Sequence, residues 1–122
     1  MEKPKVVITN KPFQETIAFL EPHCNVVANS KVEIWSKSKM MAELRDATAM
    51  MAFMPDVVDE SFLDACPSLK MISCALKGYD NFDQNACARR GISITFVPDL
   101  LTKPTAELAV GLTIALARNM RA

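Results

Sequence analysis

The chain has 122 residues, of which half are hydrophobic, and its 14 basic and 14 acidic residues cancel. This is enough apolar sequence for one domain with a buried core, and too short a chain for two. Because the balanced charge provides no basic field, we expect neither nucleic acid nor a membrane as a partner.

The cysteines and the chain termini indicate the class of protein. Four cysteines stand far apart without a Cys-x-x-Cys pair, at positions 24, 66, 74 and 87. This spacing is typical of reduced cysteines in a cytoplasmic protein, and it predicts neither a disulfide framework nor a metal site. The amino terminus does not read as a signal peptide, and the longest apolar run, residues 108–117, is well short of the ~20 residues of a membrane span.

The first part of the chain predicts two strands and two helices. Residues 5–9 are a β-rich run, and apolar residues then fall at helical spacing over residues 13–20. Pro22 ends this helix, and residues 25–28 form a second short strand. Ser36 is a suitable N-cap for the second helix.

The middle of the chain continues the alternation. Residues 49–54 predict a third strand, and a short helix is expected from Asp59 until Pro67 ends it. Residues 69–76 are an apolar run that predicts a buried fourth strand. Asp83 then caps the fourth helix.

The last part predicts one more strand and one more helix. Gly91, directly after two arginines, is the expected stop of the fourth helix, and residues 92–97 form the fifth strand. Pro104 stands at or near the first position of a final helix, over residues 105–119.

Five alternations of strand and helix, with short connections and continuously apolar strands, predict an α/β fold with a doubly wound parallel sheet. We expect the flavodoxin-like strand order 2-1-3-4-5. A loop bracketed by Pro98 and Pro104 is the nearest feature to a domain boundary. The five predicted strands lie before this loop, and the predicted final helix follows it.

The final helix is apolar around its whole circumference, which is unusual for a helix at a protein surface. We expect it to be buried by pairing with a second copy, by swapping between chains, or by folding back onto the sheet. An exposed patch of this kind would otherwise aggregate.

Lys77-Gly78 follows the fourth strand, where α/β domains hold small anions. The ammonium would supply charge, and glycine would let backbone N–H groups approach a ligand. The alternative is a simple turn in which Gly78 provides a backbone angle and Asp80 and Asn81 act as caps. No Gly-x-Gly-x-x-Gly motif follows any strand, so we do not expect this chain alone to bind NAD in the usual way. His23, the single histidine, is expected to cap a helix end without a catalytic role.

Five blocks of sequence together indicate a family: in chain order, residues 46–56, 65–67, 74–83, 95–102 and 104–108. These blocks resemble the D-isomer-specific 2-hydroxyacid dehydrogenase family and, within it, the phosphite dehydrogenases. The resemblance extends over about residues 5–122. Since members of the family are longer than this chain, it implies that the chain is the amino-terminal, substrate-binding part of an NAD-dependent enzyme. Residues 1–99 would be the substrate-binding domain, and residues 100–122 would be a hinge and the first helix of a truncated dinucleotide-binding domain.

The resemblance also implies roles for particular residues. Lys77 and Gly78 would bind the substrate oxyanion, phosphite, and Met54 would form a wall of the pocket. Leu100 would border the cleft, and Thr105 would lie near the nicotinamide. The catalytic Arg, Glu and His of the family, and most of the NAD site, would lie in sequence absent from this chain. It therefore carries no catalytic residue of its own, and we expect it to be inactive alone.

Three alternatives remain open. The first is an ordinary D-2-hydroxyacid dehydrogenase, although that family usually has glycine where Leu76 stands and a small residue in place of Lys77. The second is a signalling receiver domain with Asp56 after the third strand, although Thr9 and Asn10 stand where a receiver needs an acidic pair. The third is a non-catalytic binding or dimerisation domain, whose last helix would form a homodimer.

Overall fold

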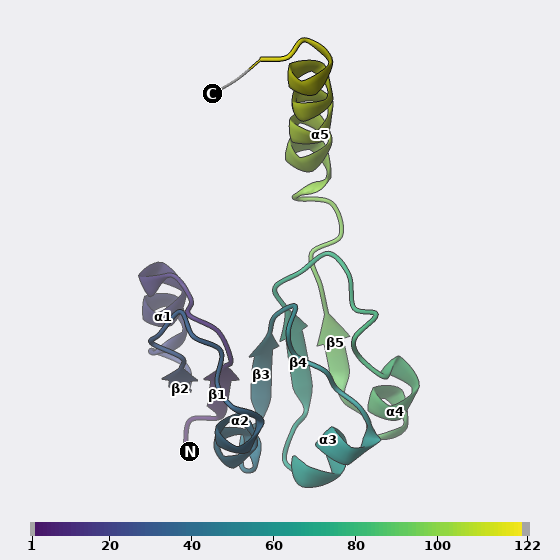
Figure 1. Cartoon of the computed structure of the whole chain (residues 1–122). Helices are drawn as coiled ribbons and strands as arrows, with labels where there is room; N and C mark the ends of the chain where they lie inside the picture. Colours follow the sequence, from purple (N-terminus) through teal and green to yellow (C-terminus); the bar gives the residue numbers. More distant parts are fainter. Residues whose placement is uncertain (1, 121–122) are drawn as a thin grey trace.

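The computed structural model describes residues 2–120, which form one sheet of parallel strands with helices around it (Figure 1). The strands are β1 (Lys5–Ile8), β2 (Asn25–Ala28), β3 (Ala49–Ala52), β4 (Met71–Cys74) and β5 (Ser93–Thr95). The helices are α1 (Gln14–Leu20), α2 (Lys37–Leu44), α3 (Glu60–Ala65), α4 (Gln84–Arg89) and α5 (Thr102–Ala117). The sheet has the order β2-β1-β3-β4-β5, which confirms the predicted doubly wound, flavodoxin-like fold.

The predicted helix ends are confirmed by their capping contacts. The Ser36 side chain accepts a hydrogen bond from the backbone N–H of Lys39, and Asp59 and Asp83 cap α3 and α4 in the same way. Gly91 has a φ of 68°, a conformation that side chains disfavour, so glycine is needed where α4 ends.

The strands are shorter than the sequence predicts at their carboxyl ends. The prediction of residues 49–54 exceeds β3 by two residues, and the prediction of residues 69–76 likewise extends past β4. In both places the apolar run continues beyond the last residue that pairs in the sheet. The strand ends earlier because the chain turns there toward a cleft. Met54 and Leu76, which are among these excess residues, line that cleft.

The hydrophobic core lies on the sheet face that α2, α3 and α4 cover. Val7, Met50 and Ile72 are aligned on neighbouring strands and are at most 1% exposed. Leu44, Phe62, Leu63 and Cys87, from those three helices, complete the same cluster. Burial of this apolar surface is the main stabilising contribution to the domain.

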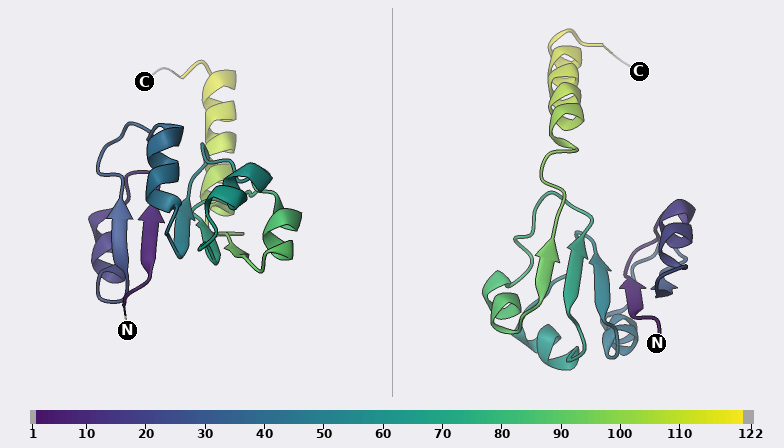
Figure 2. Two further views of the ribbon diagram at one scale, coloured as in Figure 1. Left: turned by 90° about the horizontal axis from the view of Figure 1, so that it is seen from below. Right: turned by 180° about the vertical axis from the view of Figure 1, so that it is seen from behind.

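The opposite sheet face is less well covered than the face that α2, α3 and α4 pack on. Helix α1 packs beside β2 on this face, but it contains no fully buried residue (Figure 2). Val6, Met51 and Met71 line an apolar groove of about 490 Å³ there, and Phe19 is 75% exposed at its edge. One side of the sheet is therefore partly open in the described residues.

Helix α5 stands beyond the carboxyl ends of the strands, away from the sheet (Figure 2). It does not fold back onto the sheet, and its large apolar side chains are all more than half exposed: Leu108, Val110, Leu112, Ile114 and Leu116. The helix starts three residues earlier than predicted, because Pro104 fits within the first turn, where backbone N–H groups have no helical partner. Among residues 2–120, no helix is both long and apolar enough to cross a bilayer.

Candidate anion-binding cleft

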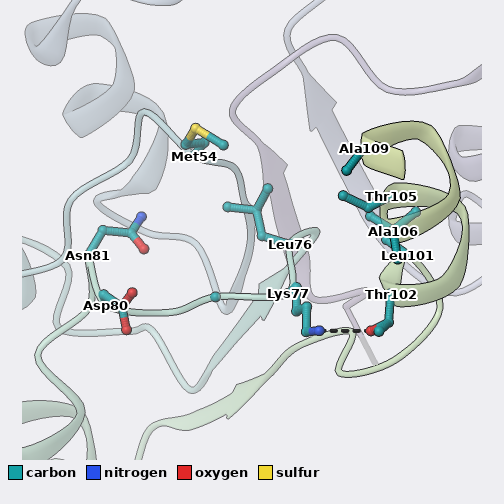
Figure 3. A pocket seen from close by; sticks show the side chains of 11 residues that line it. Met54, Leu76, Lys77, Asp80, Asn81, Leu101, Thr102, Thr105, Ala106 and Ala109 are labelled. Carbon is teal, nitrogen blue, oxygen red and sulfur yellow. Dashed lines mark hydrogen bonds between the residues drawn. The ribbon is translucent and has the colours of Figure 1, made fainter. Parts of the chain in front are cut away.

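An open cleft of about 740 Å³ lies between the carboxyl edge of the sheet and the start of α5 (Figure 3). In doubly wound folds this edge is the usual place for ligands. Eleven residues line it: Met54, Leu76, Lys77, Gly78, Asp80, Asn81, Leu101, Thr102, Thr105, Ala106 and Ala109. They come from the turn after β3, the loop after β4 and the first turns of α5.

The loop after β4 is attached firmly to its surroundings. The Cys74 thiol donates to the Gly78 carbonyl at 3.3 Å, and the Val97 N–H donates to the Leu76 carbonyl at 2.9 Å. The Tyr79 ring packs on Phe96, with 4.7 Å between the ring centroids. These contacts hold the Lys77-Gly78 backbone at the entrance of the cleft.

Asp56 connects the turn after β3 to the rest of the edge. Its carboxylate is 5% exposed and accepts from the Thr9 hydroxyl at 2.5 Å and from the Phe53 N–H at 2.7 Å. Burial raises the pKa of this carboxyl above its ordinary value, and the hydrogen bonds from Thr9 and Phe53 oppose that rise. The Asn81 amide donates to the Asp56 carbonyl, so both walls of the cleft are joined here.

Lys77 contributes a cation to the cleft lining. Its ammonium donates to the hydroxyl of Thr102 at 2.7 Å, across the cleft from the loop to α5 (Figure 3). Asp80 also lines the cleft, but the Lys77 ammonium forms no ion pair with it among the described residues. The ammonium therefore keeps its charge available to a small anion.

Gly78 is not required by the turn itself. Its φ lies outside the positive range, and a Cβ added to it would meet only Asp80 Oδ2, at an ordinary 3.8 Å. The sequence alternative, in which glycine provides a special backbone angle, therefore does not apply. A glycine that the fold does not need, beside a cation and facing a cleft, favours close approach of a ligand to the backbone.

The other expected site residues are placed as follows. Met54 and Thr105 line the cleft, whereas Leu100 does not, and its neighbour Leu101 takes that position. Leu100 is 76% exposed, compared with 51% for Leu101, the N-cap residue of α5. His23 is exposed just after α1 and lies outside the cleft lining.

Sequence reasoning missed Thr102, and it interpreted Asp80 and Asn81 only as turn residues. The signal for Asp80 and Asn81 was available, because both directly follow Lys77-Gly78. Thr102 carried no signal, since its role depends on a contact with a residue 25 positions away. The cleft contains a cation, amide groups and hydroxyls, which suit a small oxyanion. The sequence contains no dinucleotide-binding glycine motif, and Thr105, the expected neighbour of the nicotinamide, lines the same cleft.

The sequence comparisons agree with this arrangement. Residues 6–122 match the model of the D-isomer specific 2-hydroxyacid dehydrogenase catalytic domain. The chain is 33% identical to a glyoxylate reductase of Thermofilum pendens over 98% of its length, and 34% identical to one of Thermococcus onnurineus over 97%. It covers 36% and 35% of these two relatives, so it spans about a third of their length.

Solved structures show the same fold. The TT0316 protein of Thermus thermophilus superposes with a TM-score of 0.84 at 26% identity, over 94% of this chain and 37% of that one. The 3-phosphoglycerate dehydrogenase of Entamoeba histolytica, solved with bound NAD+, gives a TM-score of 0.72 at 28% identity, over 93% and 39%. The relatives are named for glyoxylate and not for phosphite, and none supports the receiver alternative. By its family match and its fold, this chain belongs to the D-isomer specific 2-hydroxyacid dehydrogenase family.

Proposed function

We propose that this chain is the substrate-binding part of an NAD-dependent dehydrogenase, and that Lys77 and Gly78 hold a small oxyanion substrate. The observation that carries the proposal is the Lys77 ammonium beside a glycine that the fold does not require, in the cleft between the sheet edge and α5. Family membership supports hydride transfer as the reaction class.

In this proposal the chain binds and orients, and it does not perform the chemistry. The ammonium of Lys77 neutralises substrate charge, and backbone N–H groups at Gly78 donate to an oxygen. Met54 and Leu101 contribute apolar side chains to the cleft lining. NAD, held mainly by sequence outside this chain, would accept or supply the hydride, with Thr105 near the nicotinamide.

Two substrates fit the cleft, and different observations favour them. The names of the relatives favour a small 2-oxo or 2-hydroxy acid, with glyoxylate as the first candidate. Lys77 favours phosphite, because a doubly charged oxyanion gains more from a fixed cation than a singly charged carboxylate does. Oxidation of phosphite would transfer a hydride from phosphorus to NAD and take one oxygen from water, leaving phosphate and a proton.

Steady-state kinetics of a full-length version would decide between these substrates. We expect Lys77→Ala to lower kcat/KM for phosphite by about 100-fold, the effect of losing a charge-assisted hydrogen bond, and to lower glyoxylate reduction much less. Lys103→Ala, which removes an exposed lysine paired with Glu107, is the matched control. Glyoxylate turnover without phosphite turnover would identify an ordinary hydroxyacid dehydrogenase, whereas an unaffected Lys77→Ala enzyme would refute the anion site.

We further propose that two copies of the chain associate through α5. The support is the exposure of every large apolar side chain on this helix, from Leu108 to Leu116, in a protein with no net charge. Pairing two such helices would bury the exposed surface and would form a symmetric interface. Light scattering on a sizing column would show a dimer, and a monomer at micromolar concentration would contradict the proposal.

A further inference from the structure

The contact between Lys77 and Thr102 joins two parts of the chain that otherwise barely touch. Thr102 is the first residue of α5, and its hydroxyl accepts from the Lys77 ammonium at 2.7 Å. Within residues 2–120, this is the only side-chain hydrogen bond or ion pair between α5 and the body of the domain. Both residues line the same cleft (Figure 3).

The Thr102 hydroxyl is not needed to start the helix. Leu101 is the N-cap residue, and no side chain caps this end of α5. The Thr102 N–H already donates to the Asp99 carbonyl at 3.1 Å. The Lys77–Thr102 hydrogen bond is also exposed, where such contacts contribute little to stability. A structural role therefore does not explain the hydroxyl.

The chemistry of the pair suits an anion. An ammonium has three N–H donors, so Lys77 keeps two after donating to Thr102. A threonine hydroxyl that accepts one hydrogen bond still has its own proton to donate. Accepting from a cation polarises the O–H group and makes it a stronger donor. Two donors from different elements then converge on the same part of the cleft.

We infer that Thr102 is a second anion-binding residue, which donates its hydroxyl proton to the substrate oxyanion and positions the Lys77 ammonium beside it. This inference rests on the proposed function, because it adds a ligand to the same site. It also couples the site to the hinge, since an anion held by both residues ties α5 to the sheet edge. Substrate binding would thereby restrict the orientation of the helix.

The test is an NMR titration of the 15N-labelled chain with inorganic phosphite and, separately, with phosphate. Binding is measured from the amide chemical shifts of Gly78 and Thr102. Thr102→Val, which removes the hydroxyl but keeps the shape, is expected to weaken binding about 5- to 10-fold. Thr102→Ser is expected to bind within about twofold of the unchanged chain, a rescue that a packing role would not give. Thr113→Val is the control, because its hydroxyl bonds only within α5.

The variants separate this inference from the proposed function. If Lys77→Ala weakens binding and Thr102→Val does not, the Thr102 role is wrong and the Lys77 site stands. If neither variant weakens binding, both the Thr102 inference and the proposed Lys77 anion site are overturned. Failure of Thr102→Ser to restore affinity would also refute the hydroxyl as a donor. An unchanged spectrum outside the cleft in each variant excludes loss of folding as the cause.

Discussion

Asp56 offers the most direct test of how the cleft edge is held together. Its buried carboxylate accepts hydrogen bonds from the Thr9 hydroxyl and the Phe53 N–H. The turn between Phe53 and Asp56 contains Met54, which lines the cleft. Asp56→Ala would leave both donors without this acceptor in a buried place. Asp56→Asn keeps the shape and an acceptor oxygen, so it separates hydrogen bonding from charge.

The expected magnitude follows from the contacts. Each hydrogen bond to a charged acceptor contributes about 1.5–3 kcal/mol, and removing the carboxylate returns part of its burial cost. We therefore expect Asp56→Ala to lower the free energy of unfolding by about 2–3 kcal/mol, and Asp56→Asn by less than about 1 kcal/mol. Asp99→Ala, at an exposed aspartate, is the control and should stay within about 0.5 kcal/mol.

The pH dependence gives a second readout of the same residue. Because burial raises the pKa of Asp56 in the folded state, the folded protein binds this proton more tightly than the unfolded chain does. The stability contribution of Asp56 therefore falls as pH rises from its ordinary pKa of about 3.9 through the raised folded value. Asp56→Asn should remove this part of the pH dependence.

Urea unfolding, followed by circular dichroism at several pH values between about 4 and 7, measures both effects. A loss below about 0.5 kcal/mol for Asp56→Ala would refute the reasoning, because two buried donors would then have found other partners. An equal loss for the Asn and Ala variants would instead show that the charge, and not the shape of the acceptor, holds the turn.

Three further perturbations test other parts of the chain. Gly91→Ala should destabilise the domain by about 1 kcal/mol in thermal unfolding, because the φ of Gly91 is positive. Gly111→Ala should instead raise the helicity of α5 and slow its amide exchange. A stabilising Gly91→Ala together with a destabilising Gly111→Ala would contradict the glycine argument. Glu60→Gln should reduce the stability that the protein loses in acid. Arg90 lowers the pKa of Glu60, so the stabilisation by this ion pair disappears as pH falls through the lowered pKa. If the effect of the substitution does not shrink in concentrated salt, it does not come from an exposed ion pair. Leu112→Lys should convert the proposed α5 dimer into a monomer on a sizing column, and an unchanged mass would place the interface elsewhere.

Much of the fold could be predicted because its signals are local. Apolar runs, helical spacing and the caps at Ser36, Asp59 and Asp83 are properties of a few neighbouring residues, and short connections between apolar strands imply parallel pairing. The sequence also predicted that Lys77-Gly78, which follows a strand, lies at the ligand-binding edge of the sheet, because the carboxyl ends of parallel strands share one edge. These features predicted a parallel sheet and the edge that carries the candidate site, and the strand order was expected from the flavodoxin-like fold class, as the structure confirms.

Contacts between distant segments could not be predicted in the same way. Whether Leu100 or Leu101 lines the cleft depends on how the chain enters α5, because neighbouring residues in a turn or helix point in different directions. The burial of Asp56 against Thr9 depends on the pairing of β1 with β3, in which Ile8 aligns with Met51. These strands are neighbours in the sheet but not in the sequence.

The sequence by itself determined the strand and helix alternation, the caps and the family resemblance, because each is encoded in residue type and spacing. The tertiary structure decided that Thr102 meets Lys77, that Gly78 is free of backbone strain, and that α5 stands away from the sheet. The physical reason is that side-chain direction and exposure depend on packing between segments far apart in the chain, where local pattern carries no information.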